Sequence, residues 1–121
     1  MGYSARFSAL SIKEKPIILG IESSCDETAA AIIRGRALLS NVVLSSAAEQ
    51  AKYGGVVPEI ASRAHTDAIG KAVETAVREA GIRNADIDAV AVTYGAGLLG
   101  ALLVGLSFAK SFAWSLGVPL I

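Results

Sequence analysis

Short apolar runs alternate with polar or glycine-containing segments in the first part of the chain. Three runs rich in Ile, Leu, Val and Ala occupy residues 17–21, 28–33 and 37–44. Polar turns at residues 22–27 and 34–36 separate them. Runs of this length and composition predict strands, and turns this short join neighbouring strands as hairpins. We therefore expect three strands that pair as an antiparallel meander.

A repeat of apolar positions follows a small, polar loop at residues 45–55. Between residues 59 and 80 the apolar side chains recur four apart, which predicts an amphipathic helix. Pro58 suits the first turn of this helix, and Gly81 suits its end.

The end of the chain predicts a strand, a helix and a further strand. The strand covers residues 86–93, and a glycine-containing loop at residues 94–97 leads into an apolar helix that ends near Leu116. This helix is apolar nearly all round, so we expect it to be buried against the sheet or a partner. Residues 117–121 predict the final strand. The order β-β-β-α-β-α-β is that of an α/β fold with a mixed, five-stranded sheet.

Two segments differ in their expected role. Residues 16–121 form one predicted domain, whereas residues 1–15 are polar and aperiodic and are predicted to be an N-terminal extension. A domain that stops on a buried strand with no covering helix is unusual. We therefore expect this chain to be the N-terminal part of a longer protein.

Composition excludes several classes of protein. Of the 121 residues 53% are hydrophobic and 18% charged, which excludes a disordered chain. Basic and acidic residues balance at 11 each, so no overall positive charge attracts nucleic acid. The single cysteine, Cys25, excludes an internal disulfide and favours the cytoplasm. The uncharged run at residues 89–109 has the length of a membrane span, but its glycines and its change from strand to helix composition favour a buried core without a membrane.

The turn at residues 22–28 carries the densest chemistry in the sequence. Glu22, Asp26 and Glu27 place three carboxylates beside Cys25 between two strands, where backbone N–H groups face the end of the sheet. Crowded carboxylates suit a metal-bridged phosphate or a general base. A solvated hairpin turn made of ordinary turn-forming residues is the alternative.

Two glycines and the only histidine are weaker candidates. Gly95 and Gly97 lie between a strand and a helix, where glycine permits close approach of a phosphate to the backbone; a tight strand-to-helix turn explains them almost as well. His65 lies on the apolar row of the first helix, and no second ligand stands three or four residues away. A packed histidine is therefore favoured over a metal ligand.

Three longer segments resemble one family. They read Ile-Glu-Ser-Ser-Cys-Asp-Glu-Thr at residues 21–28, Tyr-Gly-Gly-Val-Val-Pro-Glu-Ile-Ala-Ser-Arg-Ala-His at residues 53–65, and Gly-Ala-Gly-Leu-Leu-Gly-Ala-Leu-Leu-Val-Gly at residues 95–105. In this order they are similar to the tRNA N6-adenosine threonylcarbamoyltransferase family, formerly called the O-sialoglycoprotein endopeptidase or glycoprotease family. The resemblance covers residues 17–121 and departs from the family at Ala96, where proline is usual.

This resemblance implies a fold and a reaction. The fold is that of actin- and Hsp70-like ATPases, which is ribonuclease H-like, with this chain supplying most of the first of two lobes. The reaction is an acyl transfer that moves threonylcarbamoyl from threonylcarbamoyl-adenylate to N6 of the adenosine next to the tRNA anticodon. By this resemblance, Asp26 and Glu27 are the catalytic acids. Ser24 and Cys25 line the same turn, and Gly95 and Gly97 form a loop that binds substrate or nucleotide, threonylcarbamoyl-adenylate or ATP.

The resemblance also implies components that this chain does not supply. A divalent metal, iron or zinc, belongs to the full-length family, but its ligands have no counterpart in these 121 residues. We therefore expect no metal site and no turnover from this chain alone. The implied partners are tRNA, a non-catalytic paralogue of the same fold and a small P-loop ATPase, and the apolar helix at residues 98–116 is a candidate for homo-association. Candidates for contacts with tRNA phosphates are Lys13, Lys15, Arg34 and Arg36.

Three other functions stay open on the sequence. A non-catalytic scaffold shares the fold, but the acidic turn at residues 22–28 and the segment at residues 53–59 argue against it. A metallopeptidase, as in the older family name, needs a cluster of zinc ligands, and the sequence provides none. A small-molecule kinase of the same superfamily carries an Asp-x-Gly-x-Thr hairpin, which differs from residues 25–28.

Overall fold

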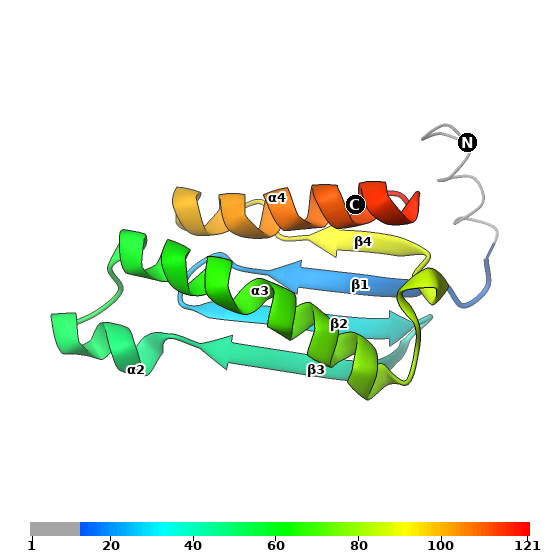
Figure 1. Cartoon of the computed structure of the whole chain (residues 1–121), viewed down its shortest axis with the longest axis horizontal. Helices are drawn as coiled ribbons and strands as arrows, with labels where there is room; N and C mark the ends of the chain where they lie inside the picture. Colours follow the sequence, from blue (N-terminus) through cyan, green and yellow to red (C-terminus); the bar gives the residue numbers. More distant parts are fainter. Residues whose placement is uncertain (1–12) are drawn as a thin grey trace.

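The computed structural model describes residues 13–121 as a four-stranded sheet with two long helices (Figure 1). The strands lie in the order β3-β2-β1-β4. They are β1 (Ile17–Glu22), β2 (Glu27–Arg34), β3 (Ala37–Ser45) and β4 (Ala89–Val92). β1 pairs antiparallel with β2, and β2 with β3, whereas β4 runs parallel to β1. The predicted meander followed by a parallel strand is therefore confirmed.

The long helices begin and end close to the predicted residues. α3 (Pro58–Ala80) starts at its proline and ends at Gly81, whose φ of 71° is the left-handed conformation that glycine adopts at a helix end. α4 (Leu99–Leu116) ends in the same way at Gly117, with a φ of 68°. Pro58 has no N–H to satisfy, which suits the first position of a helix.

Three short elements were not predicted. The expected loop at residues 45–55 contains the helix α2 (Ala47–Gln50) and the 3₁₀ turn η1 (Ala51–Tyr53). Alanine, glutamate and glutamine are good helix formers, so four of them in succession close one helical turn. The 3₁₀ turn η2 (Asn84–Asp86) includes the first residue of the strand predicted at residues 86–93. β4 is therefore shorter than expected.

The predicted fifth strand is wrong: residues 117–121 form one parallel bridge, between Val90 and Leu120. Gly117 closes α4, and the N–H of Val118 still donates to the carbonyl of Ala113 in that helix, 3.1 Å away. Pro119 contributes its carbonyl to the sheet but has no N–H to donate. Only the two residues after the proline are left to pair with β4, so the sheet of residues 13–121 has four strands.

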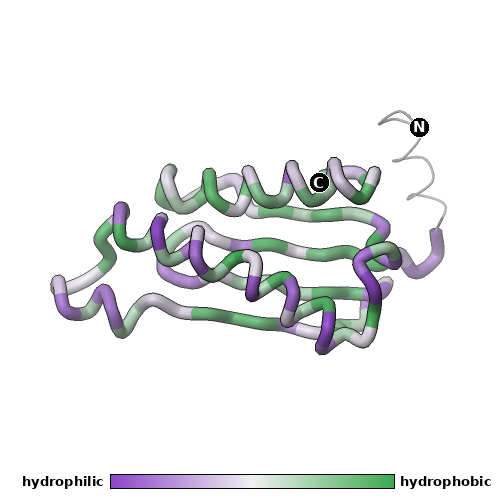
Figure 2. Tube along the Cα trace, in the orientation of Figure 1, coloured by the Kyte–Doolittle hydropathy of each residue, from purple (hydrophilic) through white to green (hydrophobic). Residues whose placement is uncertain are grey.

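The core lies between the sheet and the two helices. α3 packs over β2 and β3, α4 packs over β4 and β1, and the helices contact each other. Along β2 the residues Thr28, Ala30 and Ile32 are buried and alternate with more exposed neighbours, which is the two-residue period of a strand with one covered face. Figure 2 shows hydrophobic residues along the strands and a mixture of hydrophobic and polar residues along α3.

α4 is buried on one side only, in part contrary to expectation. Ala109 and Ala113 belong to the core, whereas Leu99 is 75% and Trp114 81% exposed. By length and composition this helix is apolar enough to cross a membrane, and in the structure it packs on the sheet and on α3. The other face of the sheet carries an open hollow of about 550 Å³, lined mainly by small residues of β1, β2 and β4.

The predicted N-terminal extension falls largely outside the described residues. Of residues 1–15 the structure describes 13–15. The ammonium group of Lys13 lies 2.5 Å from the carboxylate of Asp88, which also accepts a hydrogen bond of 2.8 Å from the N–H of Ile17. These contacts fix the beginning of β1 beside the segment that precedes β4.

Candidate active site

The sheet topology brings two predicted site segments to one edge. β1 ends at Glu22 and the parallel strand β4 ends at Val92, so the turn after β1 and the loop after β4 emerge side by side. The carboxyl ends of parallel strands are where α/β sheets carry their binding sites. Residues 22–28 are called the acidic turn below, and residues 93–98 the glycine loop.

Gly97 and Ser24 are the points where the turn and the loop touch. The N–H of Leu98 donates a hydrogen bond of 2.8 Å to the carbonyl of Ser24. A Cβ atom on Gly97 would lie 2.6 Å from that same carbonyl oxygen, so only glycine fits there. A Cβ on Gly95 would meet nothing within 4 Å, and the peptide bond that follows Gly95 is cis. Of the two predicted glycines, only Gly97 is required by contact with the turn.

Three successive carbonyl groups of the acidic turn are held by three different elements. The carbonyl of Ser24 accepts the hydrogen bond from Leu98, the residue directly before α4. The carbonyl of Cys25 lies 2.7 Å from Nε2 of His65 on α3. The carbonyl of Asp26 accepts bonds from the N–H and the hydroxyl of Ser46, at 2.9 and 3.0 Å, where β3 leads into α2. The backbone of the turn is therefore fixed at each of these peptide groups.

His65 is completely buried, as predicted for a packed histidine, but its contacts with the turn were not expected from the sequence. A carbonyl oxygen only accepts hydrogen bonds, so Nε2 carries the proton that reaches Cys25. The other ring nitrogen, Nδ1, lies 2.7 Å from the hydroxyl of Thr28 and accepts its hydrogen. A buried histidine needs hydrogen-bond partners, and that requirement was the one signal in the sequence that pointed to these contacts.

Ser23 anchors the turn to α4 and was also missed. Its buried hydroxyl donates to the carbonyl of Ala101 at 2.7 Å and accepts from the N–H of Gly105 at 3.1 Å. These are the two groups that an α-helix pairs with each other, so the hydroxyl bridges one step of the helical ladder. Nothing in the sequence distinguished Ser23 from the other hydroxyl residues of the turn.

Glu22 is the one carboxylate of this region with hydrogen-bond partners. Its two oxygens accept bonds from the N–H of Ser24, at 2.5 Å, and from the hydroxyl of Thr93, at 2.9 Å. Burial alone would raise the pKa of Glu22, but the hydrogen bonds from Ser24 and Thr93 outweigh burial and lower that pKa. Glu22 is therefore ionised, and its hydrogen bonds link the acidic turn to the glycine loop.

The side-chain carboxylates of Asp26 and Glu27 have no partner among the described residues. Within residues 13–121 neither side chain accepts a hydrogen bond or forms an ion pair; Asp26 is partly buried and Glu27 is exposed. The thiol of Cys25 is exposed beside them. Asp26 also lines an open hollow of about 380 Å³, together with Gly54 and Gly55. The turn thus presents two unpaired carboxylates on a rigid backbone.

Gln50 connects the wall of that hollow to the turn. Its side chain is 1% exposed, its amide nitrogen donates to the hydroxyl of Ser46 at 2.6 Å, and its oxygen accepts from the N–H of Val57 at 2.9 Å. Since Ser46 in turn donates to the carbonyl of Asp26, a continuous hydrogen-bonded path joins Val57 to the acidic turn. Nothing in the sequence indicated this path, because residues 45–55 were predicted to be a loop.

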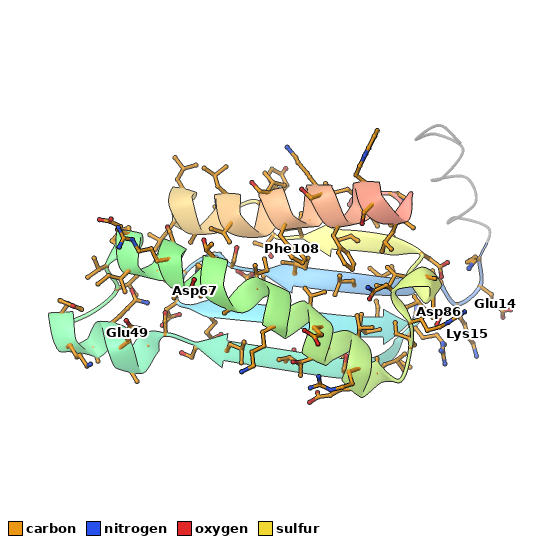
Figure 3. The ribbon with its side chains drawn as sticks, in the orientation of Figure 1. Glu14, Lys15, Glu49, Asp67, Asp86 and Phe108 are labelled. Atoms are coloured by element: carbon orange, nitrogen blue, oxygen red, sulfur yellow. The ribbon has the colours of Figure 1, made fainter. Side chains whose placement is uncertain are left out.

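The predicted basic residues lie at the opposite end of the sheet. Lys15 packs against Gly35, so it lies beside Arg34 and Arg36 at the turn between β2 and β3. Figure 3 shows Lys15 and Asp86 at the end of the sheet away from α2. Lys13, the fourth predicted residue of this group, is paired with Asp88.

Comparison with known proteins identifies the family. Residues 37–121 match the family described as tRNA N6-adenosine threonylcarbamoyltransferase. The chain belongs to this family. Proteins of that name from Clostridium perfringens and Bifidobacterium longum are 60% identical over 109 residues and 58% identical over 106 residues. These matches cover 89% and 88% of this chain but 32% and 30% of the relatives, so the chain spans about a third of the length of the curated transferases that it matches.

Solved structures add information on the fold. YeaZ from Pseudomonas aeruginosa superposes with a TM-score of 0.65 over 88% of this chain and 42% of its own, at 20% sequence identity. At this identity the likeness shows the fold alone. It agrees with the mixed α/β sheet of this member of the threonylcarbamoyltransferase family.

Proposed function

We propose that this chain supplies the acid–base part of a site that transfers threonylcarbamoyl from threonylcarbamoyl-adenylate to N6 of the adenosine next to the tRNA anticodon. The observation that carries the proposal is the acidic turn, in which Ser24, Cys25 and Asp26 are held through their carbonyls while two carboxylates stay unpaired. Membership of the transferase family supplies the reaction class.

Asp26 and Glu27 have the chemistry that such a transfer needs. The N6 nitrogen attacks the carbamoyl carbon, a new N–C bond forms, and the bond from that carbon to the phosphate oxygen of AMP breaks. The electron pair leaves with AMP, and the proton of N6 passes to a carboxylate. A general base placed on a rigid turn contributes by position as well as by basicity. We assign this role to Asp26 or Glu27, with Ser24 and Cys25 lining the same side of the site.

The peptide N–H groups of the turn suit the negative charge that develops in the reaction. In a planar trans peptide the N–H points away from the carbonyl of the same group. Because the carbonyls of Ser24 and Cys25 point at Leu98 and His65, the N–H groups of Cys25 and Asp26 point the other way, and neither has a partner within residues 13–121. Such donors stabilise an oxyanion or a phosphate oxygen. Gly97 allows the glycine loop to lie close enough to complete that side of the site.

Residues 13–121 do not form a site that fits the divalent metal implied by the family. Within residues 13–121 no group of three or more His, Cys, Asp and Glu side chains is placed to hold a metal ion. His65 in particular has both ring nitrogens occupied, by Thr28 and Cys25. No step of the proposed reaction on this chain passes through a metal. We expect the isolated chain to show no turnover, because it covers about a third of each transferase that it matches.

The proposed architecture is the first lobe of an actin- and Hsp70-like ATPase fold, formed by residues 16–121. The TM-score with YeaZ supports the sheet and helices of such a lobe. The exposed apolar side of α4, which includes Leu99, Leu103 and Trp114, supports association with a paralogous subunit or with a second copy of this chain. Expected further partners are tRNA and a small P-loop ATPase, and the expected compartment is the cytoplasm.

The proposal is tested on a hybrid enzyme that supplies the missing part. In this hybrid the present chain replaces the matching 109 residues of the Clostridium perfringens relative. It is incubated with threonylcarbamoyl-adenylate and tRNA, and the nucleosides of the digested tRNA are separated and weighed by mass spectrometry. We expect N6-threonylcarbamoyladenosine, formed only when both substrates are present. Cleavage of a sialoglycoprotein without modification of tRNA would instead support the peptidase of the older family name.

A further inference from the structure

His65 joins α3 to two points of the acidic turn that flank the unpaired carboxylates. Nε2 contacts the carbonyl of Cys25, directly before Asp26, and Nδ1 contacts the hydroxyl of Thr28, directly after Glu27; both distances are 2.7 Å. We propose that His65 is a positioning residue that sets the direction in which the carboxylates of Asp26 and Glu27 point. This inference rests on the proposed function, because it assumes that those carboxylates act in the transfer.

The imidazole is suited to this role by its shape and burial. Its side chain is 0% exposed, and Thr28 is 2% exposed, so water does not compete for either hydrogen bond. Neutral imidazole offers one donor and one acceptor at a fixed separation. The donor meets a carbonyl and the acceptor meets a hydroxyl, so both ends of the ring are satisfied by one tautomer.

The bond to Cys25 also controls a peptide group of the proposed site. The carbonyl of Cys25 and the N–H of Asp26 belong to the same planar peptide, so fixing one fixes the other. Rotation of this peptide would turn the N–H of Asp26 away from the developing negative charge and would move the Asp26 side chain. A displacement of about 1 Å at a reacting group lowers a rate by about 100-fold. His65 therefore acts on the reaction through Asp26, without contact with the substrate.

His65 is held by the long helix α3. Ala61 and Ile69 lie one turn before and one turn after His65 on the same face of this helix, and both are buried. The ring is thus packed on a long, capped helix instead of on a loop. A positioning residue that is supported in this way keeps its geometry between turnovers.

The first test uses the fact that this chain contains a single histidine. The ring nitrogens are labelled with ¹⁵N, and their NMR signals at neutral pH report which nitrogen carries the proton. We expect one tautomer with the proton on Nε2. In the variant T28V the signal of Nδ1 should shift, because the hydroxyl that donates to this nitrogen is removed. The control variant T66V removes an exposed hydroxyl of α3 next to His65 and should leave the Nδ1 signal unchanged. A proton on Nδ1, or fast exchange between the two tautomers, would overturn the proposal.

The second test separates positioning from folding in the hybrid enzyme. H65L removes both hydrogen bonds, whereas H65Q keeps one donor and one acceptor on a carboxamide. We expect H65L to lower kcat by about 100-fold with little change in the KM for tRNA, and H65Q to restore most of kcat. If H65L proves too unstable to assay, T28V should lower kcat, whereas T28S, which retains the hydroxyl, should behave as the wild type. Full kcat in T28V and in every His65 variant that folds would refute the positioning role.

These results remain distinct from a failure of the proposed function. The NMR measurement does not depend on any activity of the chain. If replacing the carboxylates of Asp26 and Glu27 leaves the transfer intact, the proposed function fails whatever His65 does. If those replacements abolish the transfer and H65L does not, the function stands and the positioning role falls.

Discussion

Gly97 lies directly over Ser24, so that a Cβ atom on the glycine would be 2.6 Å from the carbonyl oxygen of the serine. The same carbonyl accepts the hydrogen bond of Leu98, which prevents it from moving aside. The variant G97A should therefore destabilise the fold by about 1–3 kcal/mol through overpacking. Urea unfolding of this chain measures the change.

Gly70 provides the matched control for that substitution. It lies inside α3, where a Cβ would meet nothing within 4 Å. Alanine loses less conformational entropy than glycine in a helix, so G70A should stabilise the chain by about 0.5–1 kcal/mol. Equal effects of G97A and G70A would show that the turn and the glycine loop do not touch as described.

Ser23 and Gly105 form a second close approach, between the acidic turn and α4. The N–H of Gly105 donates to the hydroxyl of Ser23, and a Cβ on Gly105 would collide with that hydroxyl. S23A should cost about 1 kcal/mol because its hydrogen bonds are removed. G105A should cost more alone than in the S23A background, with a coupling of about 0.5–3 kcal/mol in a double-mutant cycle of unfolding free energies. Strict additivity would contradict this packing.

The hydrogen bonds of Glu22 predict an acid-sensitive contribution to stability. Because its pKa is lower in the folded chain than in the unfolded one, the stabilisation is present above the unfolded value, about pH 4.3, and is lost as the pH falls through the folded pKa. In E22Q this loss is absent, since glutamine does not titrate. Unfolding free energies measured from pH 6 to pH 3 should therefore fall less steeply in E22Q than in the wild type.

Glu49 serves as the control for the acid titration. It is an exposed residue of α2, outside the acidic turn and the glycine loop. E49Q should keep the acid-induced loss of stability that E22Q removes. An identical pH dependence in E22Q and the wild type would mean that Glu22 does not brace the two segments.

Arg34 and Arg36 are predicted to bind tRNA phosphates at the turn between β2 and β3. Reversing both charges in the hybrid enzyme should weaken tRNA binding and lower the slope of log affinity against log salt by about one unit for each phosphate that is no longer bound. The control variant K71E/R78E makes the same change in net charge at two exposed positions of α3. If both double variants bind tRNA with the same affinity and salt dependence, this end of the sheet is not a tRNA surface.

The strands, the long helices and the meander were predictable from the sequence because each depends on local patterns of two or four residues. The prediction failed at residues 117–121, where an apolar composition suggested a strand. There Gly117 caps α4 and Pro119 lacks an N–H, and such competition between neighbouring elements is not visible in composition. The short helix α2 was missed for a similar reason, because small and polar residues suit both a loop and a single helical turn.

The candidate site could be located from the sequence, but its construction could not. The carboxylates of Asp26 and Glu27 stand out by residue type. The residues that hold the turn come from elsewhere in the chain: Ser46, His65 and Leu98 reach it through contacts that depend on how the helices pack. Long-range hydrogen bonds of this kind leave no spacing rule in the sequence.

The most direct test of the proposed function is the rate of N6-threonylcarbamoyladenosine formation by the hybrid enzyme when each carboxylate is neutralised in turn. D26N and E27Q keep the size of the side chains, and E49Q serves as an exposed control. We predict that D26N or E27Q lowers kcat by about 100-fold or more, as expected for removal of a general base, with tRNA binding unchanged and E49Q fully active. Full activity in both D26N and E27Q would contradict the assignment of the acidic turn as the catalytic part of this chain.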